Sequence, residues 1–347
     1  RRQADDRPTT GRREEGPHPM WTTIECAGHP RDMGFAQGTA GATAIRAELA
    51  RAELSLQRSR WPDLRGLTSG PLRGAGAGRE LYRHFAHLAE RLEGLARRAD
   101  VPVDSLLELH LRLRAGGVAG GLLARRASLR THDAVGGGHR ARSEGSDRAV
   151  VLERTLPAAR PGEAAWIVRE SRPAVGFGSV EITLPWLVSS IAGVNEAGLA
   201  VVAGPMLWGT GGRGGQAPSI LLVQECLQRF PDLPGALDWC HKRPVEGEQA
   251  FVLADASGAT ATVTSSGRER RSQAGSGEID LEAGELPVEE SDEPRDSKVQ
   301  PGVGGTALGT DRVLLDPHRR SLRVEAEGLS LEVVARSTDE GRERDAV

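Results

Sequence analysis

Glu80, His84 and His87 could together seat a metal ion. Their offsets of four and seven residues place all three side chains on one face of a helix. Carboxylate and imidazole groups on one face can hold a metal ion, but these histidines are spaced H-x-x-H rather than H-E-x-x-H. The same face adjoins an apolar stripe that includes Leu81 and Phe85. The pattern therefore favours a solvated helix flank over a metal site, and we expect no cofactor.

The segment Gly209–Gly214 (GTGGRG) matches G-x-G-x-x-G and lies between a predicted strand and a predicted helix. A dinucleotide site needs this loop directly after a strand, with an acid about 20 residues further on in a parallel βαβ unit. Here the predicted strand ends several residues earlier, and glycine is abundant throughout, with 44 residues. The sequence favours a flexible loop over a cofactor site. No P-loop consensus occurs.

His132 and Asp133 beside Thr131 form the one compact polar group at the boundary between a helix-rich and a strand-rich half. Serine, histidine and aspartate are numerous enough for a catalytic triad to be proposed, but no G-x-S-x-G elbow marks a nucleophile. The surrounding residues 132–148 are glycine-rich and polar, without helical or strand periodicity. This pattern favours a polar loop over a catalytic group.

Cysteine is sparse, and an odd count without paired spacing predicts neither a disulfide framework nor a zinc site. We expect Cys26, Cys226 and Cys240 to be buried structural thiols. The chain begins at Arg1 and shows no charged-then-apolar leader pattern. The cytoplasm is therefore the default expectation for its location, while an upstream secretory signal stays open.

The charge balance argues against a nucleic-acid partner. The 347 residues include 45 Lys+Arg and 48 Asp+Glu, for a formal net charge of −3, whereas nucleic-acid binders usually carry a basic excess. Only two of the basic residues, Lys242 and Lys298, are lysines, which indicates drift in nucleotide composition rather than phosphate binding. No apolar run approaches the roughly 18 residues that span a bilayer, so no membrane role is expected.

The N-terminal third reads as an arm followed by helices. Residues 1–19 are polar and mixed in charge, and we expect a disordered arm. Residues 20–127 should form one strand, Trp21–Cys26, and then a helical portion that starts near Arg31. Apolar residues at helical spacing predict one continuous helix over Gly78–Ala99, and the capping pattern Ser105–Glu108 predicts another that ends near Arg114.

Residues 128–266 read as a strand-rich core. Strand-like runs begin near Val150, Trp166, Val180, Ser190 and Leu199. The residues Asn195–Gly198 predict a turn before the last run, and Asp255–Gly258 predict a hairpin turn. Pro218 stands where a helix should begin. Helices followed by strands indicate an α+β fold.

The remainder of the chain divides in two. Residues 267–305 read as an acidic, disordered insertion, because the interval from Glu278 to Lys298 holds nine acids and two bases. Residues 306–347 should return to the core as C-terminal strands and a tail, with strand-like runs at 312–315, 321–325 and 329–334.

Three segments carry a family resemblance. Gly28–Gly38 is similar to an opening G-x-P-x-x-x-G-x-x-x-G segment, Ala192–Leu199 to a Gly-Met-Asn-Glu-Ala-Gly-Leu turn, and Phe251–Gly258 to a strand with an Asp-Ala-x-Gly turn. In this order they resemble peptidase family C45, the autoproteolytic acyltransferases and amide hydrolases related to the fungal penicillin acyltransferase. Choloylglycine and acid ceramidase-like hydrolases are relatives of that family. The resemblance covers roughly residues 21–265.

The resemblance implies a four-layer αββα N-terminal nucleophile fold, here with an N-terminal helical portion. It also implies self-cleavage ahead of a cysteine, whose new terminal amine serves as base for the thiol that attacks an amide or thioester carbonyl. Hydrogen-bond donors stabilise the oxyanion in such a reaction. By its position in the turn, Asn195 would supply one donor.

The sequence departs from the family at three catalytic positions. The interval 127–134, where the nucleophile is expected, contains no cysteine. Glu153-Arg154-Thr155 stands where the family has Asn-x-Asp, and no Thr-Asn-His segment follows the hairpin at Asp255. Loss of the nucleophile removes the covalent route.

Three functional hypotheses follow. The first is a divergent, catalytically impaired acyltransferase or amide hydrolase homologue that retains an acyl- or amide-binding cleft. The second is an active enzyme that uses Thr131 or Ser128 as nucleophile after self-cleavage, with Asn195 in the oxyanion hole and a small acyl, amide or peptide-like substrate. The third is a non-enzymatic interaction protein whose acidic insertion recruits a basic partner. The oligomeric state stays open.

Overall fold

The computed structural model describes residues 21–54, 72–112, 129–133, 150–157, 166–206, 216–247, 249–266, 269–275, 310–326 and 329–336. The expected arm at 1–19, Ser128, the glycine loop at 209–214 and residues 276–305 of the expected acidic insertion lie outside this part of the chain. Within it, six helices accompany a large mixed sheet, a smaller antiparallel sheet and a pair of two-residue strands. No helix described here has the length and apolarity needed to cross a membrane.

The large sheet has eight strands, and its first two neighbours, β1 and β4, run parallel while the others pair antiparallel. In spatial order the strands are β1 (Thr22–Gly28), β4 (Ile167–Pro173), β5 (Ser179–Thr183), β6 (Ala192–Asn195), β7 (Ala200–Met206), β10 (Gln249–Ala254), β11 (Thr260–Ser266) and β12 (Glu269–Gly275). The central strands β5, β6 and β10 are buried along their whole length, as expected for strands covered on both faces.

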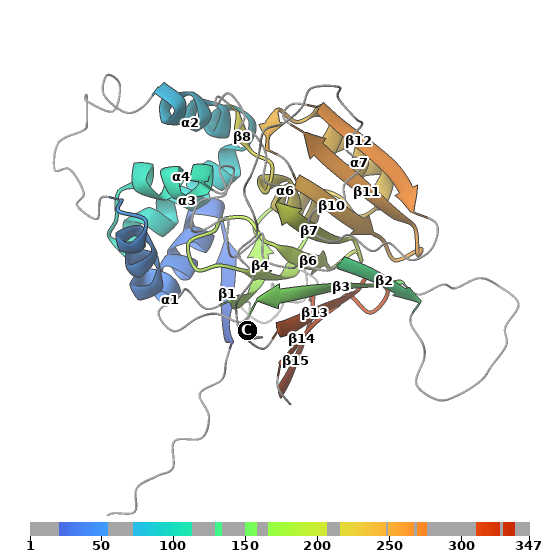
Figure 1. The fold of residues 1–347 in the computed structure, drawn as a ribbon. Coiled ribbons are helices and arrows are strands. Elements are labelled where there is room, and N and C mark those ends of the chain that lie inside the picture. The colour runs from blue at the N-terminus through green and yellow to red at the C-terminus, as the bar shows by residue number, and fades with distance from the viewer. Residues whose placement is uncertain are drawn as a thin grey trace, which may run out of the picture.

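The smaller sheet packs against the large one (Figure 1). Its order is β15 (Leu329–Val334), β14 (Ser321–Ala326), β13 (Thr310–Asp316), β3 (Val150–Pro157) and β2 (Leu129–Asp133). β13 and β14 contact β6 and β5, and β3 contacts β7. Alternate residues such as Leu152, Val313 and Leu315 are completely buried. The two sheets therefore enclose one core.

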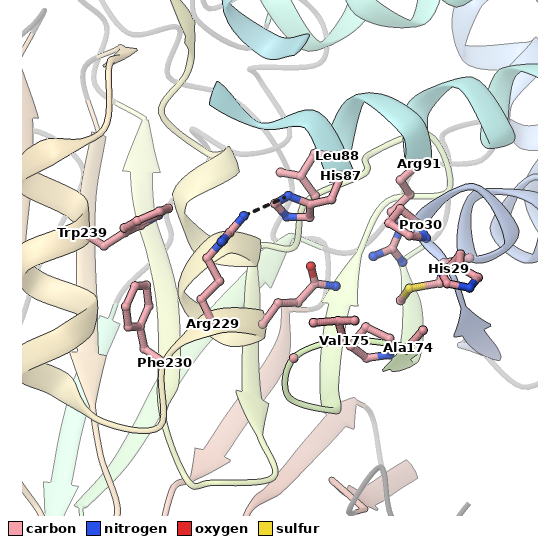
Figure 2. Close-up of a pocket in the computed structure, with 14 residues that line it drawn as sticks. His29, Pro30, His87, Leu88, Arg91, Ala174, Val175, Arg229, Phe230 and Trp239 are labelled. Atoms are coloured by element: carbon pink, nitrogen blue, oxygen red, sulfur yellow. Dashed lines mark hydrogen bonds between the residues drawn. The ribbon is translucent and has the colours of Figure 1, made fainter. Parts of the chain in front are cut away.

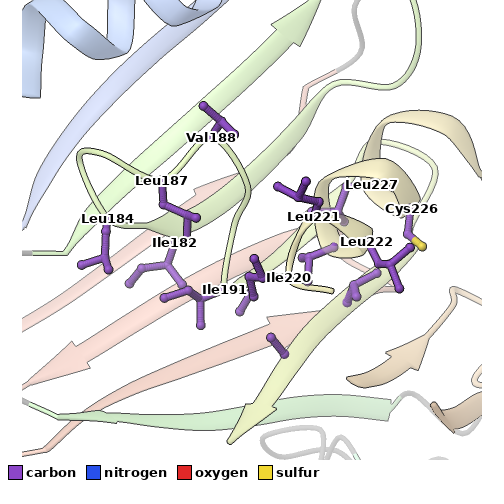
Figure 3. Packing of buried hydrophobic residues seen from close by; sticks show 14 of the residues in the cluster. Ile182, Leu184, Leu187, Val188, Ile191, Ile220, Leu221, Leu222, Cys226 and Leu227 are labelled. Carbon is purple, nitrogen blue, oxygen red and sulfur yellow. The ribbon is translucent and has the colours of Figure 1, made fainter. Parts of the chain in front are cut away.

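The helices are α1 (Pro30–Arg51), α2 (Leu72–His84), α3 (Ala86–Ala99), α4 (Val103–Arg112), α6 (Leu221–Arg229) and α7 (Leu233–Lys242). α1 packs on β1, and α6 packs on β6 and β7. Figure 3 shows Leu221, Leu222 and Leu227 of α6 near Ile182 and Ile191. Helices, large sheet and small sheet make three layers. A fourth, helical layer on the small sheet is not seen among the described residues, so the αββα arrangement stays a prediction.

Most elements of the regular core agree with the sequence-based expectations. β1 follows Trp21, α1 begins at Pro30, and β10 and β11 form the predicted hairpin. Gly198 at the β6–β7 turn and Gly258 at the hairpin turn have φ values of 94° and 82°, a region that glycine enters without strain. The late strands β13, β14 and β15 also form where predicted.

The predicted continuous helix over Gly78–Ala99 is wrong, because the chain breaks at Phe85 between α2 and α3. Phe85 has φ −134° and ψ 44°, outside the helical region, and its side chain is completely buried. Burial of this ring in the core takes precedence over helix continuity. The break also removes the single helical face that was expected to align His84 with His87.

Two other expectations fail locally. Pro218 does not begin a helix. It lies in β8 (Ala217–Pro218), which pairs with β9 (Val245–Glu246), and α6 starts at Leu221. The predicted start of the insertion at residue 267 is also wrong, because Glu269–Gly275 forms β12 at the end of the large sheet. β12 is polar and mostly exposed, as edge strands often are, and so resembles a loop in sequence.

His110 fastens α4 to the loop after β5. Its imidazole is 2% exposed, Nδ1 lies 2.7 Å from the Leu106 carbonyl oxygen, and Nε2 accepts a hydrogen bond from the Val188 amide at 3.2 Å. The acceptor role of Nε2 places the proton on Nδ1. Burial lowers the pKa of His110 to about 4, although the bond to Leu106 opposes this shift. The folded protein therefore holds this ring neutral.

We predict that His110 makes the protein sensitive to mild acid. Its pKa rises from about 4 in the folded protein to an ordinary 6.5 on unfolding. The unfolded chain thus binds the extra proton between these values. The buried neutral ring contributes about 3 kcal/mol to the free energy of unfolding. This contribution is fully present above pH 6.5 and is lost as the pH falls toward 4.

Urea unfolding between pH 7 and 4.5 tests this expectation. His110→Gln, which keeps a donor and an acceptor but does not titrate, should flatten the pH dependence. His241→Gln, at an exposed position of α7, should leave it unchanged. Equal pH slopes for wild type and His110→Gln would contradict the assignment.

Candidate ligand-binding site

A cavity of about 560 Å³ opens between α3, the start of α1 and the end of α6. Figure 2 shows Arg91, His29 and Pro30 at one end, Phe230 and Trp239 at the other, and His87 between them. The remaining wall is the loop after β4, with Ala174, Val175 and Gly176. Its lining is predominantly apolar, with a few charged groups, which is the usual character of a small-molecule site.

Close contact between α1 and α3 fixes the Arg91 end. A Cβ atom on Gly34 would lie 2.1 Å from the Arg91 carbonyl oxygen, and one on Gly94 would lie 2.1 Å from the Arg31 carbonyl oxygen. Only glycine allows the two helix backbones to approach so closely. The glycine-containing segment Gly28–Gly38 thus places Arg91 beside the start of α1.

Asn195 holds the opposite wall. Its Nδ2 donates to the carbonyl oxygens of Leu227 at 2.9 Å and Phe230 at 2.8 Å, which fixes the end of α6. Its Oδ1 accepts from the amides of Ala197 and Leu199 and so closes the β6–β7 turn. The side chain is completely buried and does not line the cavity. These bonds use both of its donor hydrogens, and its predicted oxyanion role stays a prediction.

Asp255 holds α7 to the β10–β11 hairpin. Its Oδ2 accepts from the Leu233 amide at the start of α7 at 3.1 Å, and its Oδ1 accepts from the Ser257 amide at 3.0 Å. α7 carries Trp239, which lines the cavity. Each of the three segments that resemble the C45 family therefore positions one wall of this cavity.

A buried ion pair lies close to Arg91, which lines the cavity. Arg169 of β4 and Glu181 of β5 stand directly opposite each other, both with no solvent exposure, and Nε of Arg169 donates to Oε2 of Glu181 at 2.6 Å. Gln37 of α1 and Gln224 of α6 accept further hydrogen bonds from Arg169 at 2.9 and 2.6 Å. Burial alone would raise the pKa of Glu181, but Arg169, Arg91 and the hydrogen bonds of Ser179 and Gln224 together lower it.

Arg91 is the second buried guanidinium, and it lines the cavity. Its side chain is 1% exposed, and none of its three guanidinium nitrogens donates to an oxygen or nitrogen acceptor among the described residues. The neighbouring Cys26 sulfur offers at most a weak acceptor. Burial, reinforced by repulsion from Arg169, lowers the pKa of Arg91 to about 10. Arg91 therefore remains charged at neutral pH.

The three cysteines are free and buried, which confirms that part of the sequence-based expectation. Cys26 lies near Arg91 and Arg169, but burial has the largest effect and raises the pKa of its thiol despite both charges. Cys226 and Cys240 face each other with their sulfur atoms 3.6 Å apart, and their mutual hydrogen bond together with burial raises the pKa of Cys226. Thiols of this kind are structural rather than nucleophilic.

Glu225 organises the Trp239 end of the cavity. This buried carboxylate contacts His87 Nε2 at 2.9 Å and Arg229 Nε at 3.0 Å, and accepts a hydrogen bond from Trp239 Nε1 at 3.0 Å. His87, with its side chain 22% exposed, thus lies at the boundary between solvent and the buried Glu225 carboxylate. Glu80 and His84 pair at 3.2 Å on α2. Among the described residues, no three potential metal ligands lie together.

Neither proposed nucleophile is among the described residues that line this cavity. The backbone of Thr131 lies in β2, opposite Leu152 of β3, and only its backbone is described. Ser128 lies outside the described residues. The described lining includes no residue of β2. The nucleophile roles of Thr131 and Ser128 stay predictions.

The sequence motifs did not identify Arg91 as a site residue, although its position in the helix carries a signal. It lies three residues after Leu88 and immediately before Leu92, on the buried face of α3. An arginine within an apolar stripe indicates a buried cation that needs a partner.

Comparison with known proteins gives only remote similarity. No family model and no curated protein matches the chain. Penicillin V acylase from Agrobacterium tumefaciens superposes with a TM-score of 0.39 and 14% identity, over 59% of this chain and 84% of the acylase. A mutant form of conjugated bile acid hydrolase from Clostridium perfringens gives a TM-score of 0.39 and 8% identity, over 60% of this chain and 92% of the hydrolase.

We predict that Gly34→Ala disrupts the α1–α3 contact and with it the cavity. The new Cβ would overlap the Arg91 carbonyl oxygen, so the helices must separate at a cost of about 2–3 kcal/mol. Gly78→Ala is the matched control, because its Cβ would meet only the end of the Leu107 side chain at 3.2 Å. Chemical denaturation measures both, and equal stabilities would refute the proposed role of Gly34.

Proposed function

We propose that this chain is a divergent relative of the C45-type acyltransferases and amide hydrolases that binds an acyl or amide compound in the cavity between α3 and α6 and does not turn it over covalently. One observation carries the proposal: Gly34, Asn195 and Asp255, one from each family-like segment, hold three walls of the same cavity. The family-like residues thus make contacts that hold helices and turns in place. This supports the view that the chain has kept the family's scaffold.

The cavity suits the apolar part of such a compound. Ligand cavities typically have volumes of about 300–1,000 Å³, with apolar walls and a few polar groups, and this one measures about 560 Å³. Met33, Leu88 and Phe230 contribute apolar surface to its lining. An acyl chain or aryl group would be removed from water there, which supplies most of the binding free energy.

The positions of the three cysteines support the absence of covalent turnover. Covalent attack on a carbonyl requires an activated nucleophile next to the substrate. Cys26, Cys226 and Cys240 are buried, and none lines the cavity. The competing hypotheses, self-cleavage at Thr131 or Ser128 and partner capture by the acidic insertion, depend on segments that are wholly or partly outside the described residues.

The intact mass of the purified protein tests the inactive state. We expect a single species of full length that remains unreactive toward amide and thioester substrates, because the segment 127–134 lacks the family's cysteine. Two fragments, the second beginning with Thr131 or Ser128, would show that the chain matures by self-cleavage and would overturn this part of the proposal.

Filling the cavity tests the binding function. Ala174 is half-buried in the wall, so Ala174→Phe should occupy the cavity and abolish the rise in melting temperature caused by acyl compounds. Ala47→Phe, on the exposed face of α1, should retain the full rise. Ligand binding that survives Ala174→Phe would place the site elsewhere.

A further inference from the structure

We infer that the ligand of this cavity is an amphipathic monocarboxylate, whose carboxylate binds the Arg91 guanidinium while its apolar body extends toward Phe230. This inference rests on the proposed function and deepens it by assigning the ligand's charge and its direction in the cavity. The first observation in its support is the balance of buried charges around Arg91. Arg91 and Arg169 supply two positive charges, and Glu181 supplies one negative charge.

The neighbours of this cluster do not cancel the excess charge. Gln37 and Gln224, which complete the hydrogen bonds of Arg169, are neutral. The Cys26 thiol stays protonated at neutral pH, since burial raises its pKa. Within the described part of the chain one buried positive charge thus remains uncompensated, and burying such a charge is strongly unfavourable without an anion.

The unpaired charge is also the one that reaches the cavity. Arg169 is hydrogen-bonded on all sides, whereas the nitrogens of Arg91 are buried at the cavity wall without an oxygen acceptor among the described residues. A guanidinium presents donors in a planar fork that matches the two oxygens of a carboxylate. A bound carboxylate can complete these bonds, since no described side chain offers them an oxygen acceptor.

The start of α1 adds to the positive potential at this end. His29 and Pro30 line the cavity beside Arg91, and His29, the N-cap residue of the 22-residue helix, forms no side-chain capping bond. The N-terminus of a helix carries a partial positive charge and favours anions. Asp32, the acid of that first turn, is exposed and does not line the cavity.

The charges at the far end are already paired, which limits the ligand to one carboxylate. Arg229 contacts Glu225 at 3.0 Å and lies 5.0 Å from the centre of the Trp239 ring, while His87 also contacts Glu225. Leu88 lies between the two ends, and Met33 adds to the apolar lining. A second carboxylate would meet no free cation among these residues, whereas an alkyl or aryl body fits the apolar walls.

Calorimetric titration with matched probes tests the inference. We would compare 4-phenylbutyrate with 4-phenylbutyramide, and octanoate with octanamide, because each pair differs mainly in the charge of its head group. Wild type should bind each carboxylate at least about tenfold more tightly than its amide. Arg91→Gln should reduce this ratio to near one, and Arg97→Gln, an exposed arginine of the same helix, should preserve it.

The outcomes separate this inference from the proposed function. Amides that bind wild type as tightly as carboxylates would overturn the carboxylate assignment, and if that binding is abolished by Ala174→Phe, the acyl-binding function stands. A carboxylate preference that survives Arg91→Gln would also overturn the assignment. Binding of neither probe class would overturn both. The wild-type comparison does not depend on the folding of any variant.

Discussion

Arg169 and Glu181 form an ion pair without solvent exposure on neighbouring strands of the large sheet. Its hydrogen bonds are completed from α1 by Gln37, from α6 by Gln224, and from the loop after β5 by the carbonyl oxygens of Leu187 and Ser189. These elements come from distant parts of the chain. The pair therefore determines where both helices rest on the sheet, and so where the cavity between them opens.

Such a pair is stable only when every group in it is satisfied, because the loss of hydration of two buried charges costs several kcal/mol per ion. Arg169 and Glu181 meet this requirement. Arg91 finds no oxygen or nitrogen acceptor among the described residues, and it adds a charge of the same sign as Arg169 within the same buried region. The structure thus holds a positive charge at the cavity wall, ready to bind an anion.

The sequence predicted much of the scaffold because turns and strands leave local signals. Asn195, Gly198 and Asp255 stand in turns whose geometry depends on those residue types, and the turns formed as expected. Two predictions were wrong for the same reason: the continuous helix through Phe85 and the disordered insertion that included Glu269–Gly275. A helix break caused by a buried ring and an exposed edge strand are both determined by tertiary contacts rather than by local periodicity.

The site was less predictable than the fold. Asn195 was singled out for its place in a motif, yet its hydrogen bonds hold α6 and the β6–β7 turn. Arg91 belongs to no motif, and its importance depends on Arg169, Cys26 and Glu181, which lie far from it in sequence. Only the close approach of α1 and α3, which Gly34 and Gly94 allow, brings Arg91 to these residues.

Unfolding free energies of Arg91→Met and Arg169→Met, measured without ligand, test the claim of an uncompensated charge most directly. Arg169→Met should lose about 3–5 kcal/mol, because it leaves Glu181 buried without its main partner. Arg91→Met removes a charge that has no anionic partner among the described residues, so it should be as stable as wild type or more stable. A loss for Arg91→Met as large as that for Arg169→Met would contradict the account, since Arg91 would then be paired within the protein.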